Sequence, residues 1–516
     1  MDHARRQNDH RHFARGCQRA PRWRLVAVFF VLGAAVPGLG MPDAGTVYSI
    51  DPSTAPPSHD GFGAAFLHGM RFTGAFSLDW RNVGPRYPDY ETQVQDEVFL
   101  SDTYVGFEGP FVDSVPFKVE FNMPTSNQGV MDLYQLYFAY DRIPDVKLQA
   151  GKFLVPFGYY NQLYRPDDYL TVTRPLAFAS PDDLDLVSRV NSPTPPLSVG
   201  YTDIGGRASY YPTARSALVP KELTVYVVNG LGETPNRSRT FPNPAQLGVP
   251  EIAAGGTNID FGHQDNNLAD NNNPKAVGGR VSWSLGDVRL PLPGGEFTDL
   301  KGVTWSASMM DSDYNLEGNL NYQIYDSALN FLWEGFSISS EYVYGYNQFI
   351  APIDHGADPS NQPQWSTSDL NACDINGVTG GVPCGENFQI NQGYYVQAAW
   401  PLIRKPWWGK RLMGALVFNQ LFHRGPALDL FSGVDIGGTT YSSIEALDPS
   451  GVRASTRMNK YTAAVDYEMT RHFQLKAEYS YWVMGDATTP TPDFANAPQH
   501  GSTDIYQTVL ALVMGF

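Results

Sequence analysis

MRFTGAFSLDWR (70–81) alternates large apolar residues with polar ones. On an extended chain, one face carries Met70, Phe72, Phe76, Leu78 and Trp80, and the other carries Arg71, Thr73, Ser77, Asp79 and Arg81. A period of two is the pattern of a β-strand whose two faces meet different surroundings. The stretch FQLKAEYSYWV (473–483) divides in the same way near the other end of the chain. The sequence therefore predicts an all-β protein built from many such strands.

The same division into two faces marks sixteen predicted strands. They cover 69–82, 96–108, 114–123, 131–141, 145–155, 196–211, 221–230, 275–286, 301–311, 318–332, 334–349, 392–402, 411–423, 457–469, 471–484 and 504–516. Short links, such as 142–144 and 287–300, alternate with long ones, and every long link follows an odd-numbered strand. The long links are 156–195, 231–274, 350–391, 424–456 and 485–503. An even-stranded outer-membrane barrel has short periplasmic turns and long outer loops, which explains this order, whereas a soluble sandwich does not.

The chain ends on IYQTVLALVMGF (505–516), in which Leu510, Leu512, Met514 and Phe516 occupy alternating positions. This ending resembles the last strand of bacterial outer-membrane barrels. Together with the order of the links, it predicts a transmembrane antiparallel β-barrel of about 16 strands. A barrel of this size encloses water rather than a packed core, so we expect an inward-folded loop that constricts the channel.

Seven arginines precede the apolar run LVAVFFVLGAAV (25–36), which Pro37 and Gly38 end. This is the arrangement of a secretory signal peptide, and the run is too short to cross a membrane as a helix. We expect a cleaved signal peptide over 1–40, a flexible periplasmic lead-in over 41–68 and a barrel over 69–516. Such a chain belongs in a bacterial outer membrane, in contact with its lipid.

Charge and cysteine content narrow the possible partners. The chain has 36 basic and 53 acidic residues, and residues 1–40 hold seven Arg and two Asp, so the mature chain keeps 29 basic and 51 acidic residues, a formal charge of −22. This acidity argues against a nucleic-acid partner and favours cations near the lumen or loops. Cys373 and Cys384 are predicted to form a loop disulfide after export. Because no CxxC spacing or cluster of His accompanies them, we expect neither a metal nor a cofactor.

GKFLVPFG (151–158) ends a predicted strand and begins the first long link. With the rest of 148–178, and with VYVVNGLG (225–232) and DNNNPKAVGGRVSW (270–283), it resembles the phosphate-selective porins O and P family. The resemblance implies a sixteen-stranded barrel, usually a homotrimer, whose 156–195 link folds into the lumen as the constriction. It also implies rows of Arg and Lys facing phosphate. Here the link carries three Arg against five Asp, which argues against phosphate selectivity.

Charged residues of this link form the predicted constriction and solute-binding set: Arg165, Asp167, Asp168, Arg174 and Arg189. Charged residues on the polar strand faces are predicted to line the lumen: Arg71, Arg81, Lys118, Glu120, Arg280, Lys476 and Glu478. In a channel, rings of charge set the ion preference and the width sets the size limit. Two arrangements remain open, namely opposed basic and acidic walls, or charges that are each paired with a neighbour.

These features predict a passive diffusion channel for small hydrophilic solutes or ions, with phosphate and other anions among the candidates, and no enzyme. The alternatives are a barrel-based outer-membrane hydrolase and a specific carbohydrate or carboxylate channel. A hydrolase needs a nucleophile with a His and a carboxylate in reach, and the sequence shows no GxSxG or HExxH motif. A plugged receptor needs about 22 strands, which would leave no residues for the plug. A soluble lectin-like sandwich leaves the ending at Phe516 unexplained.

Overall fold

The computed structural model describes most of the predicted strands and part of the long link after the fifth strand. The described residues are 70–84, 96–112, 115–123, 131–179, 196–197, 200–213, 219–231, 275–291, 297–313, 321–352, 373–374, 382–403, 411–424, 428–430, 434–436, 439–441, 444–446, 455–484 and 503–516. The predicted signal peptide (1–40) and periplasmic lead-in (41–68) lie outside them. Among the described residues, no helix is long and apolar enough to cross a membrane.

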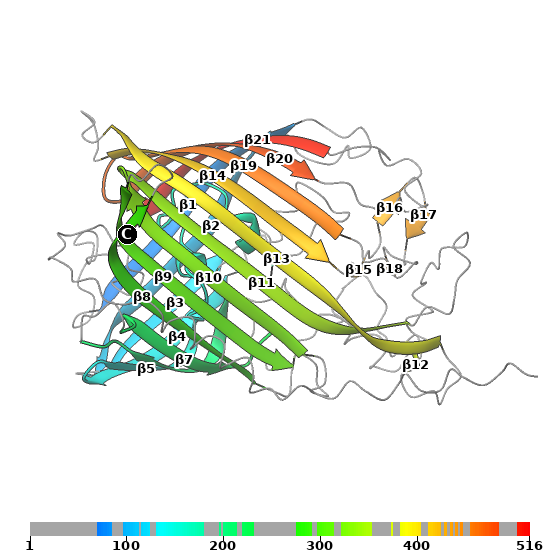
Figure 1. Cartoon of the computed structure of the whole chain (residues 1–516), viewed down its shortest axis with the longest axis horizontal. Coiled ribbons are helices and arrows are strands. Elements are labelled where there is room, and N and C mark those ends of the chain that lie inside the picture. Colours follow the sequence, from blue (N-terminus) through cyan, green and yellow to red (C-terminus); the bar gives the residue numbers. More distant parts are fainter. Residues whose placement is uncertain are drawn as a thin grey trace, which may run out of the picture. The chain divides into compact units, whose positions relative to one another are not determined.

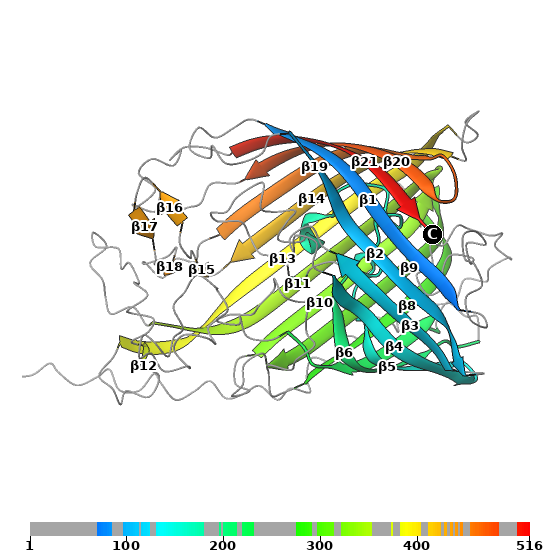
Figure 2. The ribbon, with the colours of Figure 1, turned by 180° about the vertical axis from the view of Figure 1, so that it is seen from behind.

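The described strands form one closed antiparallel β-barrel of sixteen strands (Figures 1 and 2). They are β1 (Arg71–Gly84), β2 (Asp96–Val112), β3 (Val115–Met123), β4 (Asp132–Ile143), β5 (Val146–Leu154), β6 (Thr202–Tyr210), β7 (Glu222–Val228), β8 (Ala276–Pro291), β9 (Phe297–Asp313), β10 (Asn321–Trp333), β11 (Phe336–Pro352), β13 (Val382–Ile403), β14 (Arg411–Arg424), β19 (Ser455–Glu468), β20 (Phe473–Met484) and β21 (Thr503–Gly515). Each pairs with the next, and β1 also pairs with β21. The predicted fold class and strand number are confirmed.

Five further strands of two or three residues lie in the long links. They are β12 (Cys373–Asp374), β15 (Leu428–Leu430), β16 (Val434–Ile436), β17 (Thr439–Tyr441) and β18 (Ile444–Ala446). β12 pairs in parallel with the start of β13, while β15 pairs with β18 and β16 pairs with β17. They add to the links and not to the barrel wall.

The barrel closes between its first and last strands. Gly74 and Phe516 exchange two backbone hydrogen bonds of 2.7 Å and 2.9 Å, and Ala75 pairs with Gly515. The Phe516 ring stacks on Phe72 with a centroid distance of 5.1 Å. A Cβ at Gly74 would lie 2.7 Å from that ring, so a residue without a side chain is needed for the ring to sit there. The terminal stretch predicted from its alternation is therefore the closing strand.

The strands turn apolar side chains outward, and β7 shows the pattern most simply. Leu223, Val225 and Val227 are 45%, 56% and 48% exposed, whereas the residues between them are buried. β20 alternates in the same way between the exposed Tyr479 and the buried Glu478. Apolar side chains on the outside of a closed barrel are stable beside lipid and not beside water. The predicted division of the strands into two faces is confirmed.

Replacing Val225 by Arg should destabilise the barrel in a bilayer by roughly 2–4 kcal/mol, because the charge would face hydrocarbon. The measurement is the free energy of unfolding in lipid vesicles, from a denaturant titration. Val225→Leu is the matched control and should keep the wild-type value. Equal stability of the two variants would show that this face of β7 does not lie in lipid.

Several predicted strand boundaries are wrong. β6 begins at Thr202 rather than at 196, and β13 begins at Val382 rather than at 392. The link predicted at 287–300 is largely strand, since β8 continues to Pro291 and β9 begins at Phe297. The Gly and Pro residues of this stretch are typical of a turn, which is why the sequence predicted a link here, but most of the stretch continues the two strands.

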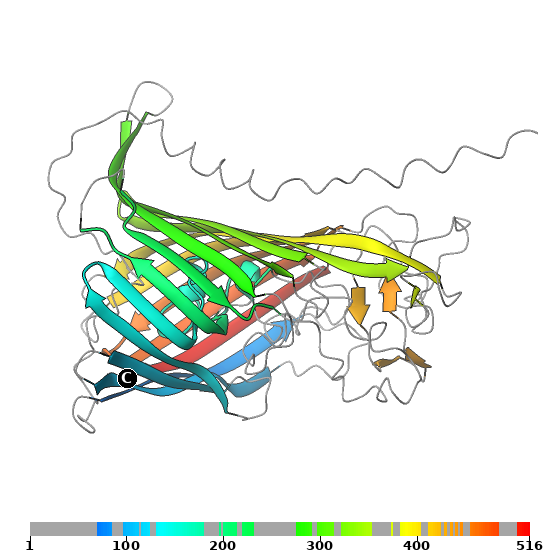
Figure 3. The ribbon, with the colours of Figure 1, turned by 90° about the horizontal axis from the view of Figure 1, so that it is seen from below.

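The β8–β9 hairpin bends away from the barrel wall at the end that carries the short turns, as the green hairpin of Figure 3 shows. Gly286 and Gly302 have positive φ angles of 69° and 59°, and the β8–β9 register shifts on both sides of Gly286. Glycine adopts this backbone region without a steric penalty. These two glycines therefore set the bend.

Candidate functional site

The long link after β5 folds into the barrel, and its first described part, residues 155–179, is called the inner segment. It contains three prolines, which cannot donate a backbone hydrogen bond to a sheet, so the chain leaves the ladder after Leu154. Two short 3-10 turns, η2 (Tyr160–Gln162) and η3 (Leu176–Phe178), follow. The inner segment forms hydrogen bonds with buried side chains of three strands, β3, β11 and β20. These strands lie far apart around the barrel wall.

Glu341 of β11 holds the beginning of the inner segment. Its carboxylate accepts the backbone N–H groups of Tyr159 at 2.7 Å and Tyr160 at 2.9 Å, and the hydroxyl of Tyr395 at 3.1 Å. The N–H of Gly158 donates to the hydroxyl of Ser308 on β9 at 2.8 Å. Hydrogen bonds to a carboxylate are stronger than neutral ones, and Glu341 is 2% exposed. This residue is therefore the first anchor of the segment.

Glu478 of β20 holds the later part of the inner segment. Its carboxylate accepts the backbone N–H groups of Val172 and Thr173, both at 2.8 Å, together with the Thr173 hydroxyl. Lys460 of β19 lies 3.4 Å from the same carboxylate and donates to the Thr173 hydroxyl. Glu478 was predicted to line the lumen, and the structure places it on the buried face as the second anchor.

Lys476, also predicted to line the lumen, binds backbone rather than a carboxylate. Its ammonium group donates to the carbonyl of Pro166 at 2.7 Å and to the carbonyl of Tyr169. The side chain is 3% exposed. It therefore positions the middle of the inner segment against β20.

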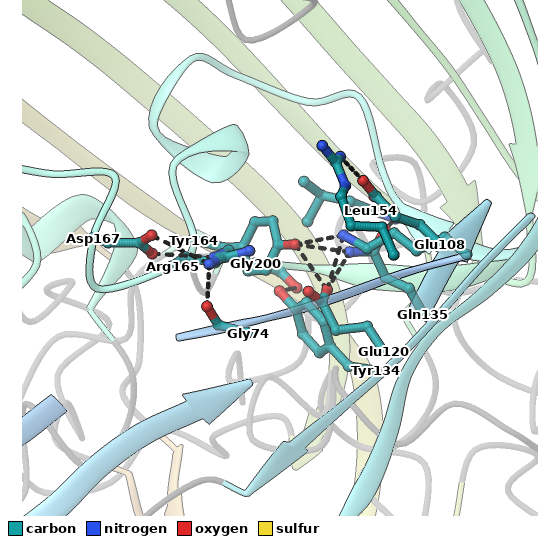
Figure 4. Close-up of polar contacts among 12 residues, drawn as sticks. Gly74, Glu108, Glu120, Tyr134, Gln135, Leu154, Tyr164, Arg165, Asp167 and Gly200 are labelled. Atoms are coloured by element: carbon teal, nitrogen blue, oxygen red, sulfur yellow. Dashed lines mark hydrogen bonds and ion pairs between the residues drawn. The ribbon is translucent and has the colours of Figure 1, made fainter. Parts of the chain in front are cut away.

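The side chain of Tyr164 contacts Glu120 of β3 (Figure 4), and Lys118 of the same strand contacts both. The Glu120 carboxylate accepts the Tyr164 hydroxyl and the Gln135 amide, each at 2.7 Å, and lies 3.2 Å from the Lys118 ammonium. Lys118 also donates to the Tyr164 hydroxyl at 2.9 Å. Burial, followed by the Glu120 charge, raises the pKa of Tyr164 well above its ordinary value. The tyrosine is thus held neutral, as a hydrogen-bond donor to Glu120.

Arg165 joins the inner segment to the seam where the barrel closes (Figure 4). Its guanidinium donates to the Gly74 carbonyl at 2.5 Å and to the Asp167 carboxylate at 3.1 Å. The side chains of Arg165 and Asp167 are 17% and 18% exposed, so solvent reaches both. Burial alone would lower the pKa of Arg165, but the charges of Asp167 and Asp168 outweigh it and raise that pKa. This arginine is charged at every pH at which the protein folds.

Asp168 has an unusual protonation equilibrium. Burial and then the neighbouring Asp167 raise the pKa of Asp168 to about 7, although Arg165 acts in the opposite direction. The structure therefore brings three of the predicted constriction residues together, and one of them changes its charge near neutral pH.

The other two predicted constriction residues do not join this group. Arg174 forms an ion pair with Asp102 of β2 and is buried. Arg189 lies outside the described residues.

The remaining predicted lumen charges are paired with acidic residues on the neighbouring strand. The pairs are Arg71–Glu108, Arg81–Glu97, with Nε at 2.7 Å from the carboxylate, and Arg280–Glu222, at 2.8 Å. Among the described residues, each of these three arginines is therefore balanced by a glutamate on the strand beside it. Opposed basic and acidic walls were one of the two arrangements left open by the sequence, and these pairs follow the other.

Sequence reasoning missed the partners that complete the anchors. Lys460 falls on the same face as the other inward residues of β19, so the alternation of that strand was the available signal. Tyr164 and Thr173 had none, because their roles depend on how the inner segment crosses from one strand to another. Glu222 begins β7 opposite Ser282 of β8, and Arg280 is its diagonal neighbour on the same face.

Both cysteines of the predicted disulfide belong to described strands. The backbone of Cys373 pairs with Val382, and that of Cys384 pairs with Pro352. The side chains of both cysteines lie outside the described part of the structure, so the disulfide stays a prediction. Within the described residues, no group of three or more His, Cys, Asp and Glu side chains is placed to hold a metal ion.

No protein-family model and no curated protein matches the chain. Similar solved structures include the outer membrane channel DcaP of Acinetobacter baumannii, at 10% identity and a TM-score of 0.41, covering 87% of this chain and 97% of that one. An anion-selective porin from Comamonas acidovorans has 10% identity and a TM-score of 0.40, covering 87% and 99%. OprB of Pseudomonas putida has 9% identity and a TM-score of 0.41, covering 87% and 94%.

Proposed function

We propose that this chain is an outer-membrane porin, a passive diffusion channel for small hydrophilic solutes or ions, and not an enzyme. The observation that carries the proposal is the inner segment, which buried charged side chains hold inside a closed barrel with an apolar exterior. A barrel of sixteen strands is wide enough for an aqueous channel, and a segment anchored inside it would narrow that channel. Its apolar outer face supports a location in a bacterial outer membrane.

Within this channel, Arg165, Asp167 and Asp168 form the constriction and the contact surface for solutes, and Arg189 belongs to the same link. The described inner segment carries two Arg and two Asp, so it is close to neutral when all four are charged. Lumen cations paired with carboxylates contribute little net field. These features support weak ion selectivity and speak against a site specialised for phosphate.

The resemblance of 148–178 supports membership of the phosphate-selective porins O and P family, and with it assembly as a homotrimer. The same stretch leads from β5 into the inner segment, where that family is expected to have its constriction loop. Cleavage of residues 1–40 and a disulfide between Cys373 and Cys384 complete the proposal.

A liposome-swelling assay with neutral sugars of increasing size tests the channel directly. A porin lets small sugars enter with rates that fall steeply with size and do not saturate. Saturation by one sugar or carboxylate would instead establish the specific-channel alternative. An impermeable but folded barrel that cleaves ester or glycoside substrates would overturn the proposal in favour of a hydrolase.

Cation preference should increase as the pH rises through 7, because the pKa of Asp168 is about 7 and its carboxyl gains a negative charge above that pH. The reversal potential in a salt gradient is measured at pH 6 and at pH 8, which lie about one pH unit below and above the pKa of Asp168. The difference between the two potentials reports the change in ion preference. Asp168→Asn should remove the shift between these pH values. An unchanged shift in that variant would assign the titration to another group.

A further inference from the structure

The bent β8–β9 hairpin continues past its neighbours in the barrel wall. Pairing of β7 with β8 ends at Ser282, and pairing of β10 with β9 ends at Leu300. Among the described residues beyond those points, β8 and β9 pair with each other. Residues 288–291 and 297–300, which include Leu300 as the last residue paired with β10, are called the arm. A ribbon of two strands is only marginally stable alone in water, so this one needs a surface to cover it.

The two faces of the arm differ in chemistry. In an antiparallel ribbon, directly paired residues share a face and successive pairs alternate between faces. Val288 pairs with Leu300 and Leu290 pairs with Thr298, which makes one face mainly apolar, with Leu290 41% exposed. The arm is therefore amphipathic. Unlike the strands of the barrel wall, it does not have one face toward the barrel interior, because it extends past its neighbouring strands.

The opposite face of the arm carries its charged pair, followed by Pro291 and the exposed Phe297. Arg289 pairs with Asp299, and their charged groups are 3.7 Å apart with side chains 70% and 65% exposed. The Arg289 guanidinium also lies 4.8 Å from the centre of the Phe297 ring. Such exposed charges remain hydrated, so this face turns toward water.

The apolar face of the arm is continuous with a group of aromatic residues on the outer wall. Trp333 pairs with Leu300 and donates its indole N–H to the Thr298 hydroxyl at 3.0 Å. Nearby, Trp283 and Trp305 stack with a centroid distance of 4.8 Å. Tryptophans at the rim of an apolar outer wall are typical of the membrane–water interface.

We propose that the arm lies in the membrane–water interface at the short-turn end of the barrel, with Leu290 facing lipid and Arg289 and Asp299 facing water. The proposal rests on the membrane location given under the proposed function. The bend at Gly286 and Gly302 directs the hairpin sideways from the wall, which Figure 3 shows. In that position, lipid covers the apolar face through which the arm would otherwise associate with other chains.

A fluorophore attached to single cysteines tests this placement in the full mature chain, in a Cys373→Ser, Cys384→Ser background. Leu290→Cys labels the apolar face, Asp299→Cys labels the charged face, and Val225→Cys reports on the barrel wall. In vesicles, brominated lipid should quench the labels at 290 and 225, while aqueous iodide should quench the label at 299.

Quenching at 290 by iodide but not by brominated lipid, together with lipid quenching at 225, would overturn the proposal while leaving the membrane barrel intact. A cysteine cross-link between copies at position 290 in that case would assign the face to a second subunit. If lipid quenched none of the labels, the membrane location itself would fail. The two failures are therefore distinguishable in one set of samples.

Discussion

Glu478→Ala should raise the single-channel conductance and make it fluctuate, because the inner segment would lose the acceptor of the Val172 and Thr173 N–H groups. The substitution also leaves the buried Lys460 ammonium without its carboxylate. Removing one member of a buried charge pair costs about 3–5 kcal/mol, which is enough to release a segment held by few contacts. Combining it with Glu341→Ala, which removes the first anchor, should increase the effect.

The matched control is Glu468→Ala on β19. Glu468 pairs at 2.8 Å with Arg411, whose side chain is 50% exposed, so its loss should leave the conductance unchanged. Measurements in planar bilayers compare the size and the noise of single-channel steps. Identical steps in wild type and Glu478→Ala would mean that the inner segment does not limit the flow.

Arg165→Glu should shift the channel strongly toward cations. The substitution changes the charge of the constriction by two units, next to Asp167 and Asp168. A unit charge about 4 Å away contributes roughly 1 kcal/mol in water, so two units correspond to about 2 kcal/mol. That energy is equivalent to roughly a 30-fold gain in the occupancy of a monovalent cation at the constriction and to a loss of the same size for a monovalent anion.

Arg289→Glu is the control for this substitution, because it changes the charge of the chain equally but lies on the arm, with a side chain that is 70% exposed. The reversal potential in a salt gradient measures both variants. We expect a large shift for Arg165→Glu and none for Arg289→Glu. Equal shifts would show that the total charge of the chain, rather than the constriction, determines ion preference.

The barrel was predictable because its strands obey a local rule. Each strand meets lipid on one side and polar groups on the other, so the period of two appears in the sequence without any knowledge of partners. The closing role of β21 was equally local, since Phe516 ends an alternating run that then stacks on Phe72. The β8–β9 bend was missed because the same glycines serve in turns and in bulges.

The inward orientation of several site residues was predictable, but the contacts that they make were not. Polar alternation placed Glu478 and Lys476 on the inner face, yet their partners are backbone groups of a segment about 300 residues earlier in the chain. Which carbonyl or N–H meets which side chain depends on the path of the inner segment. That path is a tertiary property, and no local pattern encodes it.

The central claim is that the inner segment leaves a narrow water-filled path through the barrel. The most direct measurement is the single-channel conductance of the purified mature chain in a planar bilayer, with the reversal potential recorded in a salt gradient. The account predicts steady steps of conductance that are carried by both ions, with a weak preference for cations above pH 7. A folded, inserted barrel that passes no current would contradict it.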